Sequence, residues 1–166
     1  MVHVMRRLVL LLAVCACVSP APATAGSGAL WATVNVCDSP SARNIIGIRA
    51  SMPGDGAAQR MYMRFEAQWY SAKRRRFVST GSSSRWVSAG SARHKSAQAG
   101  FSFQFDDPPA GTAFLMRGRV SYQWRVRRGK RSVVVRRATR LTRAGISGVR
   151  GGDPKGRSDA RCLIRH

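Results

Sequence analysis

The chain alternates apolar and polar residues with a period of two over most of its length. The clearest short example is residues 60–70, where every second residue is apolar and those between are polar or charged. A period of two is typical of a β-strand that buries one face, and no segment after residue 25 has the period of an amphipathic helix. The pattern therefore predicts an all-β protein. Further strands are expected at residues 31–37, 44–52, 73–79, 85–88 and 101–105.

The longest alternation predicts a β-hairpin over residues 113–143. In its first half every even-numbered residue is apolar or small. A two-residue turn at Arg128-Gly129 would set Trp124 opposite Val133 and bring the apolar faces of both strands to the same side. The second strand breaks the alternation in places, and a β-bulge near Val134-Val135 would account for this.

Two stretches rich in turn-forming residues complete the domain. Residues 90–100 are dominated by Gly, Ser and Ala and are expected to form a loop, and residues 144–159 are expected to form a second one. A short strand over residues 160–165 then closes the chain. The expected fold is an antiparallel β-sandwich of about seven to nine strands in a single domain, residues 26–166.

The first 25 residues predict a signal peptide. Arg6 and Arg7 precede an apolar run over residues 8–18, and Ala23-Thr24-Ala25 supplies the small residues of a cleavage site. The run is too short to cross a bilayer, which takes roughly 20 residues. We therefore expect export to the cell envelope or the extracellular space.

Export would leave two of the four cysteines in the mature chain. Cys15 and Cys17 lie within the expected signal peptide, whereas Cys37 and Cys162 remain. Two cysteines in an oxidising compartment predict one disulfide. This bond would bring the first strand and the C-terminal strand side by side.

Two short segments match motifs of a known fold family. Pro109-Ala110-Gly111-Thr112-Ala113-Phe114 is similar to a Pro-x-Gly-Thr-x-Tyr corner, with Phe114 in place of the tyrosine, and Gln68-Trp69-Tyr70 falls on the third strand. These features resemble an immunoglobulin-like sandwich of the fibronectin type III branch, in which the third strand carries a core tryptophan. The chain also resembles, more loosely, secreted proteins of high-GC Gram-positive bacteria. Since this fold hosts many activities, the resemblance implies a strand arrangement and no particular function.

Residues that carry catalysis or hold metals are scarce after residue 25. His94 is the only internal histidine, and it lies in the Gly/Ser/Ala-rich loop. Asp106 and Asp107 are the only adjacent carboxylates, and the two prolines that follow indicate a turn rather than a pair for glycoside hydrolysis. One internal histidine and two oxidised cysteines do not supply a metal-ligand set. We therefore expect no catalytic residue, no metal, no cofactor and no enzyme activity.

The chain is strongly basic, with 29 Lys and Arg against 7 Asp and Glu and a net charge of +22. Loss of Arg6 and Arg7 with the signal peptide lowers this charge to +20. The expected hairpin register places a row of cations on the outward face and sets Arg117 opposite Arg140, a like-charge pair that destabilises a sheet. The cations of this row are Arg117, Arg119, Arg125, Arg127, Lys130, Arg136 and Arg140.

This row of cations admits two interpretations. If it is a solvated face with a compositional bias to arginine, the protein is a secreted, non-catalytic binding or structural module of the envelope or extracellular space. If it is a dedicated site, the protein binds an anionic polymer or nucleic acid through the bidentate contacts of arginine to phosphate or carboxylate. The partners left open are an anionic envelope polymer, a protein and nucleic acid.

The signal peptide provides the first testable prediction. Cleavage after Ala25 should give a secreted protein that begins at Gly26. Intact-mass measurement of the exported protein checks this, and a lipid-modified Cys15 or Cys17 would contradict it.

Overall fold

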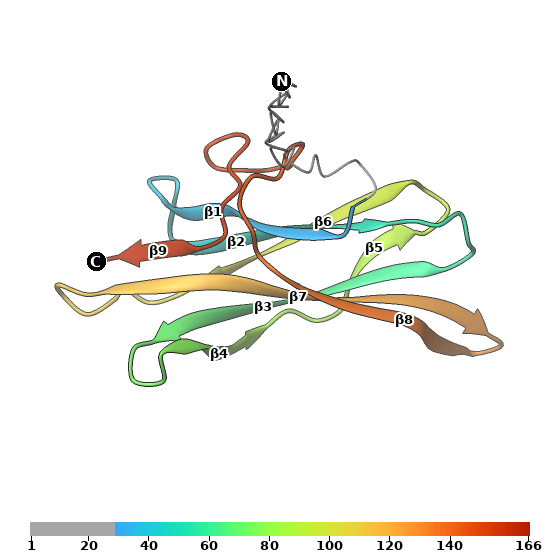
Figure 1. Ribbon diagram of the computed structural model, residues 1–166, viewed down its shortest axis with the longest axis horizontal. Coiled ribbons are helices and arrows are strands. Elements are labelled where there is room, and N and C mark those ends of the chain that lie inside the picture. The colour runs from blue at the N-terminus through green and yellow to red at the C-terminus, as the bar shows by residue number, and fades with distance from the viewer. Residues whose placement is uncertain (1–28) are drawn as a thin grey trace, which may run out of the picture.

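The computed structural model describes residues 29–166, which form two antiparallel β-sheets packed face to face (Figure 1). The expected signal peptide, residues 1–25, lies outside the described residues. Within residues 29–166 no helix is long and apolar enough to cross a membrane. The all-β expectation is confirmed. The strands are β1 (Trp31–Ser39), β2 (Ala42–Pro53), β3 (Arg60–Ser71), β4 (Arg76–Ser83), β5 (Val87–Ser91), β6 (Ser96–Gln104), β7 (Ala113–Arg128), β8 (Arg131–Leu141) and β9 (Cys162–Arg165).

The two sheets differ in size. The smaller sheet has the strand order β1-β2-β6, and the larger has the order β4-β3-β7-β8. Strand β5 extends the larger sheet beside β3, and β9 pairs with the first residues of β7. In Figure 1 the smaller sheet is the upper layer, and β3 and β7 run side by side through the lower one.

The core fills the space between the sheets with the apolar residues of the alternating pattern. Ile48 of β2, Phe65 of β3 and Val120 of β7 are almost completely buried. Their neighbours in sequence point to the opposite side of each strand, as the period of two requires. The largest fully buried side chains are Trp124, Tyr122, Phe65, Ile46, Ile48, Met52, Met61, Met63, Met116, Ile164, Val34 and Val120.

Two buried aromatic residues of β7 also carry polar atoms, and both atoms are hydrogen-bonded. The Tyr122 hydroxyl donates to the Trp31 carbonyl oxygen at 2.7 Å, and the Trp124 indole N–H donates to the Pro53 carbonyl oxygen at 3.3 Å. Burial raises the pKa of the Tyr122 hydroxyl above its ordinary value, so it remains a donor. Both bonds join the larger sheet to the smaller one.

The β7–β8 hairpin covers the expected residues in a different register. Its turn is Gly129-Lys130 rather than Arg128-Gly129, because Gly129 takes the left-handed conformation, with a φ of 58°, that suits the first turn position. The expected β-bulge is present and leaves Val135 unpaired. Beyond the bulge the alternation of β8 is reversed, so Trp124 pairs with Arg136 and not with a valine.

The tryptophan expected in the core of the third strand is not buried. Trp69 is 41% exposed, and it faces an open hollow that it lines together with Phe105 and Phe114. The buried tryptophans are Trp31 and Trp124. Trp31 belongs to β1 and Trp124 to β7, so the buried tryptophans lie on other strands than the expected one.

Residues 90–100, expected as a loop, contribute instead to two strands. They include the end of β5 and the first half of β6, which pairs with β2 along its full length. Small residues suit this position: Ala99 is buried, and a β-carbon on Gly100 would lie 3.1 Å from the Ile48 carbonyl oxygen. Backbone pairing with β2 explains why a stretch with little apolar character is a strand.

Residues 144–159 contain no strand, as expected, but they run along the outer edge of β1. Val34 and Asp159 exchange backbone hydrogen bonds of 2.9 and 3.0 Å, and the Asp153 N–H donates to the Asn35 carbonyl oxygen at 2.8 Å. The segment therefore covers a strand edge that would otherwise present unpaired backbone groups. It then leads the chain back to the larger sheet as β9.

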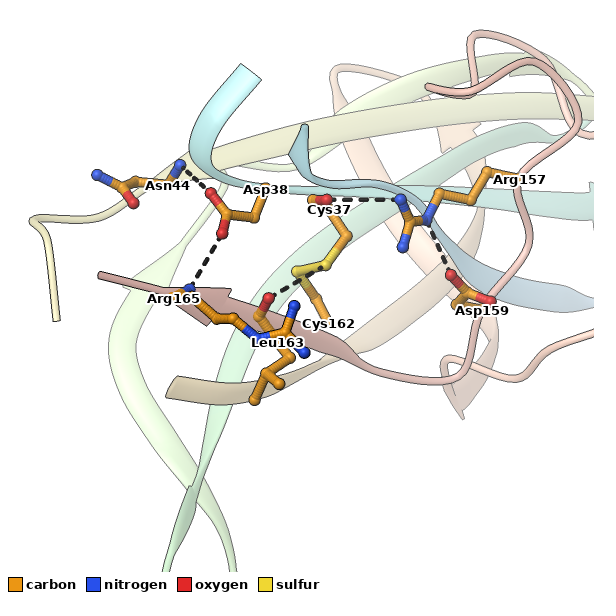
Figure 2. The surroundings of a disulfide bond; sticks show 8 residues. All are labelled: Cys37, Asp38, Asn44, Arg157, Asp159, Cys162, Leu163 and Arg165. Atoms are coloured by element: carbon orange, nitrogen blue, oxygen red, sulfur yellow. Dashed lines mark hydrogen bonds and ion pairs between the residues drawn. A yellow bond between two sulfur atoms is a disulfide. The ribbon is translucent and has the colours of Figure 1, made fainter. Parts of the chain in front are cut away.

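A disulfide between Cys37 and Cys162 confirms the expected pairing of these two cysteines. Both residues are buried, and their Cα atoms are 5.3 Å apart (Figure 2). Cys37 belongs to β1 of the smaller sheet and Cys162 to β9 of the larger one. The bond therefore joins the two layers and connects positions 125 residues apart in the sequence.

A carboxylate beside the disulfide ties the same two strands together. Asp38 accepts hydrogen bonds from the backbone N–H groups of Asn44, at 2.9 Å, and Arg165, at 3.0 Å (Figure 2). Burial by itself would raise the pKa of Asp38, but these two donors and the charges of Arg43 and Arg165 hold it below its ordinary value of 3.8. The folded state therefore favours the ionised carboxylate.

Removing the disulfide should destabilise the protein strongly. The variant with both Cys37→Ala and Cys162→Ala should lose roughly 4–5 kcal/mol of unfolding free energy, because the unfolded chain regains the entropy of a very long open loop. Urea denaturation of the variant and the wild type measures the difference. The reduced wild type is the control and should match the variant, and a loss below about 1 kcal/mol would contradict the cross-link's role.

The Asp38 carboxylate should make stability depend on acid pH. Because the folded state lowers its pKa, its contribution is complete above the ordinary pKa and is lost as the pH falls below 3.8. Asp38→Asn should cost roughly 1 kcal/mol at pH 7 and less at pH 3. Thermal unfolding at both pH values tests this, with the exposed Asp106→Asn as a control. An equal effect of Asp38→Asn at both pH values would contradict it.

Candidate functional site

The outer face of the larger sheet carries the cations of β7. Arg117, Arg119, Arg125 and Arg127 alternate along the strand with its buried residues, so they point away from the core as expected. Strand β3 adds Arg60, which lies directly opposite Arg125. Five arginines of β3 and β7 therefore lie on this face, outside the core.

Arg136 does not belong to this face, and its expected placement is wrong. It lies opposite Trp124 on the inward side of β8, with its guanidinium carbon 3.6 Å from the centre of the indole ring. A terminal nitrogen is also 4.0 Å from the carboxylate of Asp55. Arg136 therefore covers the edge of the core and has its own counter-ion.

Arg140 is likewise on the inward side, where it pairs with a core valine of β7. The cause is the bulge at Val135, which adds one residue to β8 and reverses the direction of every later side chain. The expected like-charge pair between Arg117 and Arg140 is consequently absent. Arg117 lies opposite Gln68 of β3 instead.

Arg117 is held by two neighbours on the outer face, Gln68 and Phe77. Its Nε–H donates to the side-chain oxygen of Gln68 at 2.9 Å, and its guanidinium lies 4.2 Å from the centre of the Phe77 ring. The guanidinium of Arg161 approaches the same ring at 5.6 Å. Burial, with a further contribution from Arg161, lowers the pKa of Arg117 below its ordinary value. This arginine is thus packed into the sheet surface.

Arg125 is held in the same way near the other end of β7. Its Nε–H donates to the side-chain oxygen of Gln123 at 2.8 Å. Its guanidinium carbon lies 4.3 Å from the centre of the Tyr62 ring and 5.1 Å from that of Trp86. Such cation–π contacts fix the plane of the guanidinium and leave its terminal nitrogens available.

The cations between these two arginines already have partners. Arg119 lies 3.6 Å from Glu66, the only glutamate of the chain. Arg64 donates from a terminal nitrogen to the Ser83 hydroxyl at 2.8 Å. The middle of the outer face is therefore a surface of internally satisfied polar groups.

The hairpin end of the outer face is different, because five cations there line one hollow of about 270 Å³. Its lining residues belong to β3 and to the β7–β8 hairpin, whose turn is at the right-hand end of β7 in Figure 1. We call it the cationic hollow. Its lining residues are Arg60, Tyr62, Arg125, Val126, Arg127, Lys130, Arg131 and Ser132.

No carboxylate balances the cationic hollow. The ion pairs within residues 29–166 involve none of its lining residues. Two pairs of like charges also face each other across its strands, Arg60 opposite Arg125 and Arg128 opposite Arg131. Such pairs are destabilising, so the folded protein retains electrostatic repulsion at this point that an anion would relieve.

The sequence pattern indicates only part of this site. It identified Arg125, Arg127 and Lys130 but missed Arg60 and Arg131. Arg60 begins the alternating pattern of β3, yet its position beside Arg125 depends on the pairing of strands that are far apart in the sequence. Arg131 directly follows the Gly129-Lys130 turn, where it lies opposite Arg128 and lines the hollow.

The other chemical candidates of the sequence gain no support as sites. Among residues 29–166 no group of three or more His, Cys, Asp or Glu could hold a metal ion. His94 is exposed, and Asp107 accepts a hydrogen bond from the Asn44 side-chain amide at 2.6 Å. The hollow beside Trp69, of about 390 Å³, has no charged side chain among its lining residues.

No protein-family model matches the chain, and no curated protein matches it significantly. Function is therefore inferred from the chemistry of the described residues.

Proposed function

We propose that the protein is an exported, non-catalytic module that binds an anionic polymer through the cationic hollow. A single observation carries this proposal: five cations line one hollow that contains no carboxylate. The chain has few acids, yet Arg119 and Arg136 of the same sheet each have one nearby. Most cations of residues 29–166 lack an ion-pair partner, and the hollow differs from the rest of the surface because five of them line one concavity.

The folded protein retains repulsion between the like charges that border the hollow. Opposed like charges cost tenths of a kcal/mol or more per pair, and the hollow is bordered by two such pairs. A polymer that carries one negative charge per repeat relieves this repulsion and releases its own counter-ions, which favours binding at low salt. The envelope of a bacterium offers polymers of this kind.

The fold and compartment are part of the same proposal. The disulfide between Cys37 and Cys162 is consistent with export to an oxidising compartment. We further propose an immunoglobulin-like sandwich, supported by the corner between β6 and β7. There the Thr112 backbone N–H and hydroxyl both donate to the Pro109 carbonyl oxygen, at 2.9 and 2.6 Å. A rigid sandwich of this type suits binding by a preformed surface.

Charge removal at the hollow tests the proposal. The variant Arg60→Ser, Arg127→Ser, Arg131→Ser should bind an anionic polymer such as poly(glycerol phosphate) about tenfold more weakly or worse, with a shallower salt dependence. These side chains are exposed, so the variant should keep its fold. Isothermal titration at several salt concentrations measures both quantities.

The matched control removes the same charge elsewhere. Lys73→Ser, Arg74→Ser, Arg76→Ser alters three exposed cations at the β3–β4 turn and should change affinity by no more than about twofold. Equal losses in the two variants would show that net charge alone accounts for binding. Failure of the wild type to bind any anionic polymer at low salt would also contradict the proposal.

A further inference from the structure

Two arginines of the cationic hollow are held in defined orientations by hydrogen bonds of their Nε–H groups. Arg125 uses its Nε–H on Gln123, and Arg127 uses its Nε–H on the Gly129 carbonyl oxygen at 3.0 Å. Within residues 29–166 the terminal nitrogens of neither arginine have a hydrogen-bond partner. Each guanidinium therefore keeps its paired terminal N–H groups for a ligand.

Arg125 is the better fixed of the two. Tyr62 and Trp86 hold the plane of its guanidinium, so little side-chain entropy remains to be lost when a ligand binds. Arg127 is exposed and is tied only to the turn. The geometry indicates a fixed primary contact at Arg125 and adaptable secondary contacts around it.

The arrangement of the cations favours a tetrahedral anion. A carboxylate is planar and one arginine fork satisfies it, whereas the oxygens of a phosphate group diverge and accept from donors in several directions. Here cations come from β3, from β7 and from both sides of the hairpin turn. The hollow, at about 270 Å³, is near the lower end of ligand-pocket sizes and has room for a phosphate group.

The aromatic rings at the hollow offer little to nucleic-acid bases. Proteins that bind single-stranded nucleic acid stack successive bases on free aromatic faces. Tyr62 and Trp86 are both partly buried, and Arg125 lies over both rings. The exposed aromatic residues of β3, Trp69 and Tyr70, are at its opposite end. The hollow thus offers cations for a phosphate group but no free aromatic face on which a base could stack.

We propose that the cationic hollow is a subsite for a single phosphate group of a polymer that has no aromatic bases, with Arg125 as its bidentate ligand. Gln123 and Trp86 act as positioning residues, because they reach the phosphate only through Arg125. This inference rests on the proposed function and names the ligand class of the same site.

The chain provides an internal control for this proposal. Arg117 is held by Gln68 and Phe77 as Arg125 is held by Gln123 and Tyr62, but it does not line the hollow. Substitution of either arginine by lysine keeps the net charge and removes the planar fork. A difference in affinity between the two lysine variants therefore measures the contribution of the Arg125 guanidinium at the hollow, because both variants have the same net charge.

Arg125→Lys should weaken binding of poly(glycerol phosphate) about tenfold, whereas Arg117→Lys should change it by no more than about twofold. Gln123→Ala should weaken binding several-fold and Gln68→Ala should not. Single-stranded DNA with the same number of phosphates should bind no more tightly than poly(glycerol phosphate), and polyglutamate should bind more weakly. Equal effects of the two lysine variants, or preference for DNA or polyglutamate, would overturn the proposal.

A second measurement tests the subsite apart from polymer binding. Titration of the wild type with inorganic phosphate should shift the NMR signals of the Arg125 Nε–H and the Trp86 indole N–H but not that of the Arg117 Nε–H. Sulfate at equal ionic strength is the comparison for a tetrahedral anion, and acetate is the comparison for a planar one. Absence of the phosphate shift, or an equal shift with acetate, would overturn the subsite. If phosphate binds here and no polymer does, only the proposed function fails.

Discussion

The pairing of β3 with β7 is the constraint on which both the core and the charged face depend. The ladder runs without interruption from Arg60 opposite Arg125 to Trp69 opposite Met116. On its inner side it brings together the largest buried side chains, and on its outer side it assembles the arginines. A slip of one residue would turn one strand's apolar side chains toward water, so burial of the core holds the cations in their positions.

Covalent and hydrogen-bonded contacts between the two sheets stabilise the sandwich despite the repulsion between like charges on the outer face. The segment after β8 covers the edge of β1, and the chain then returns to the larger sheet, where the disulfide of Cys162 and the hydrogen bonds of Asp38 fasten β9 to β1 (Figure 2). This attachment is remote from the cationic hollow in sequence. A stable sandwich can therefore tolerate opposed like charges at one end of its surface, as ligand sites commonly require.

Much of the fold followed from local patterns. The alternation at residues 60–70 and in β7 determined which side chains are buried, because strand geometry sends successive residues to opposite faces. The expected pairing of Cys37 with Cys162 predicted the contact between β1 and β9. Two exceptions depend on neighbours that are remote in the sequence. The Gly/Ser/Ala-rich residues 96–100 belong to a strand because β2 supplies their hydrogen bonds, and Trp69 is exposed because it lines an open hollow.

Local sequence patterns are not sufficient to predict which arginines form the site. The sequence by itself determined that β7 presents arginines on the side away from its core residues, and that acids are too few to neutralise them. Only the tertiary structure decided which of those arginines share a site. The bulge at Val135 moved Arg136 and Arg140 to the inner face, and the β3–β7 ladder brought Arg60 to Arg125. Both effects depend on backbone hydrogen bonds between strands, and a period-two pattern describes one strand at a time and carries no information about its partner's register.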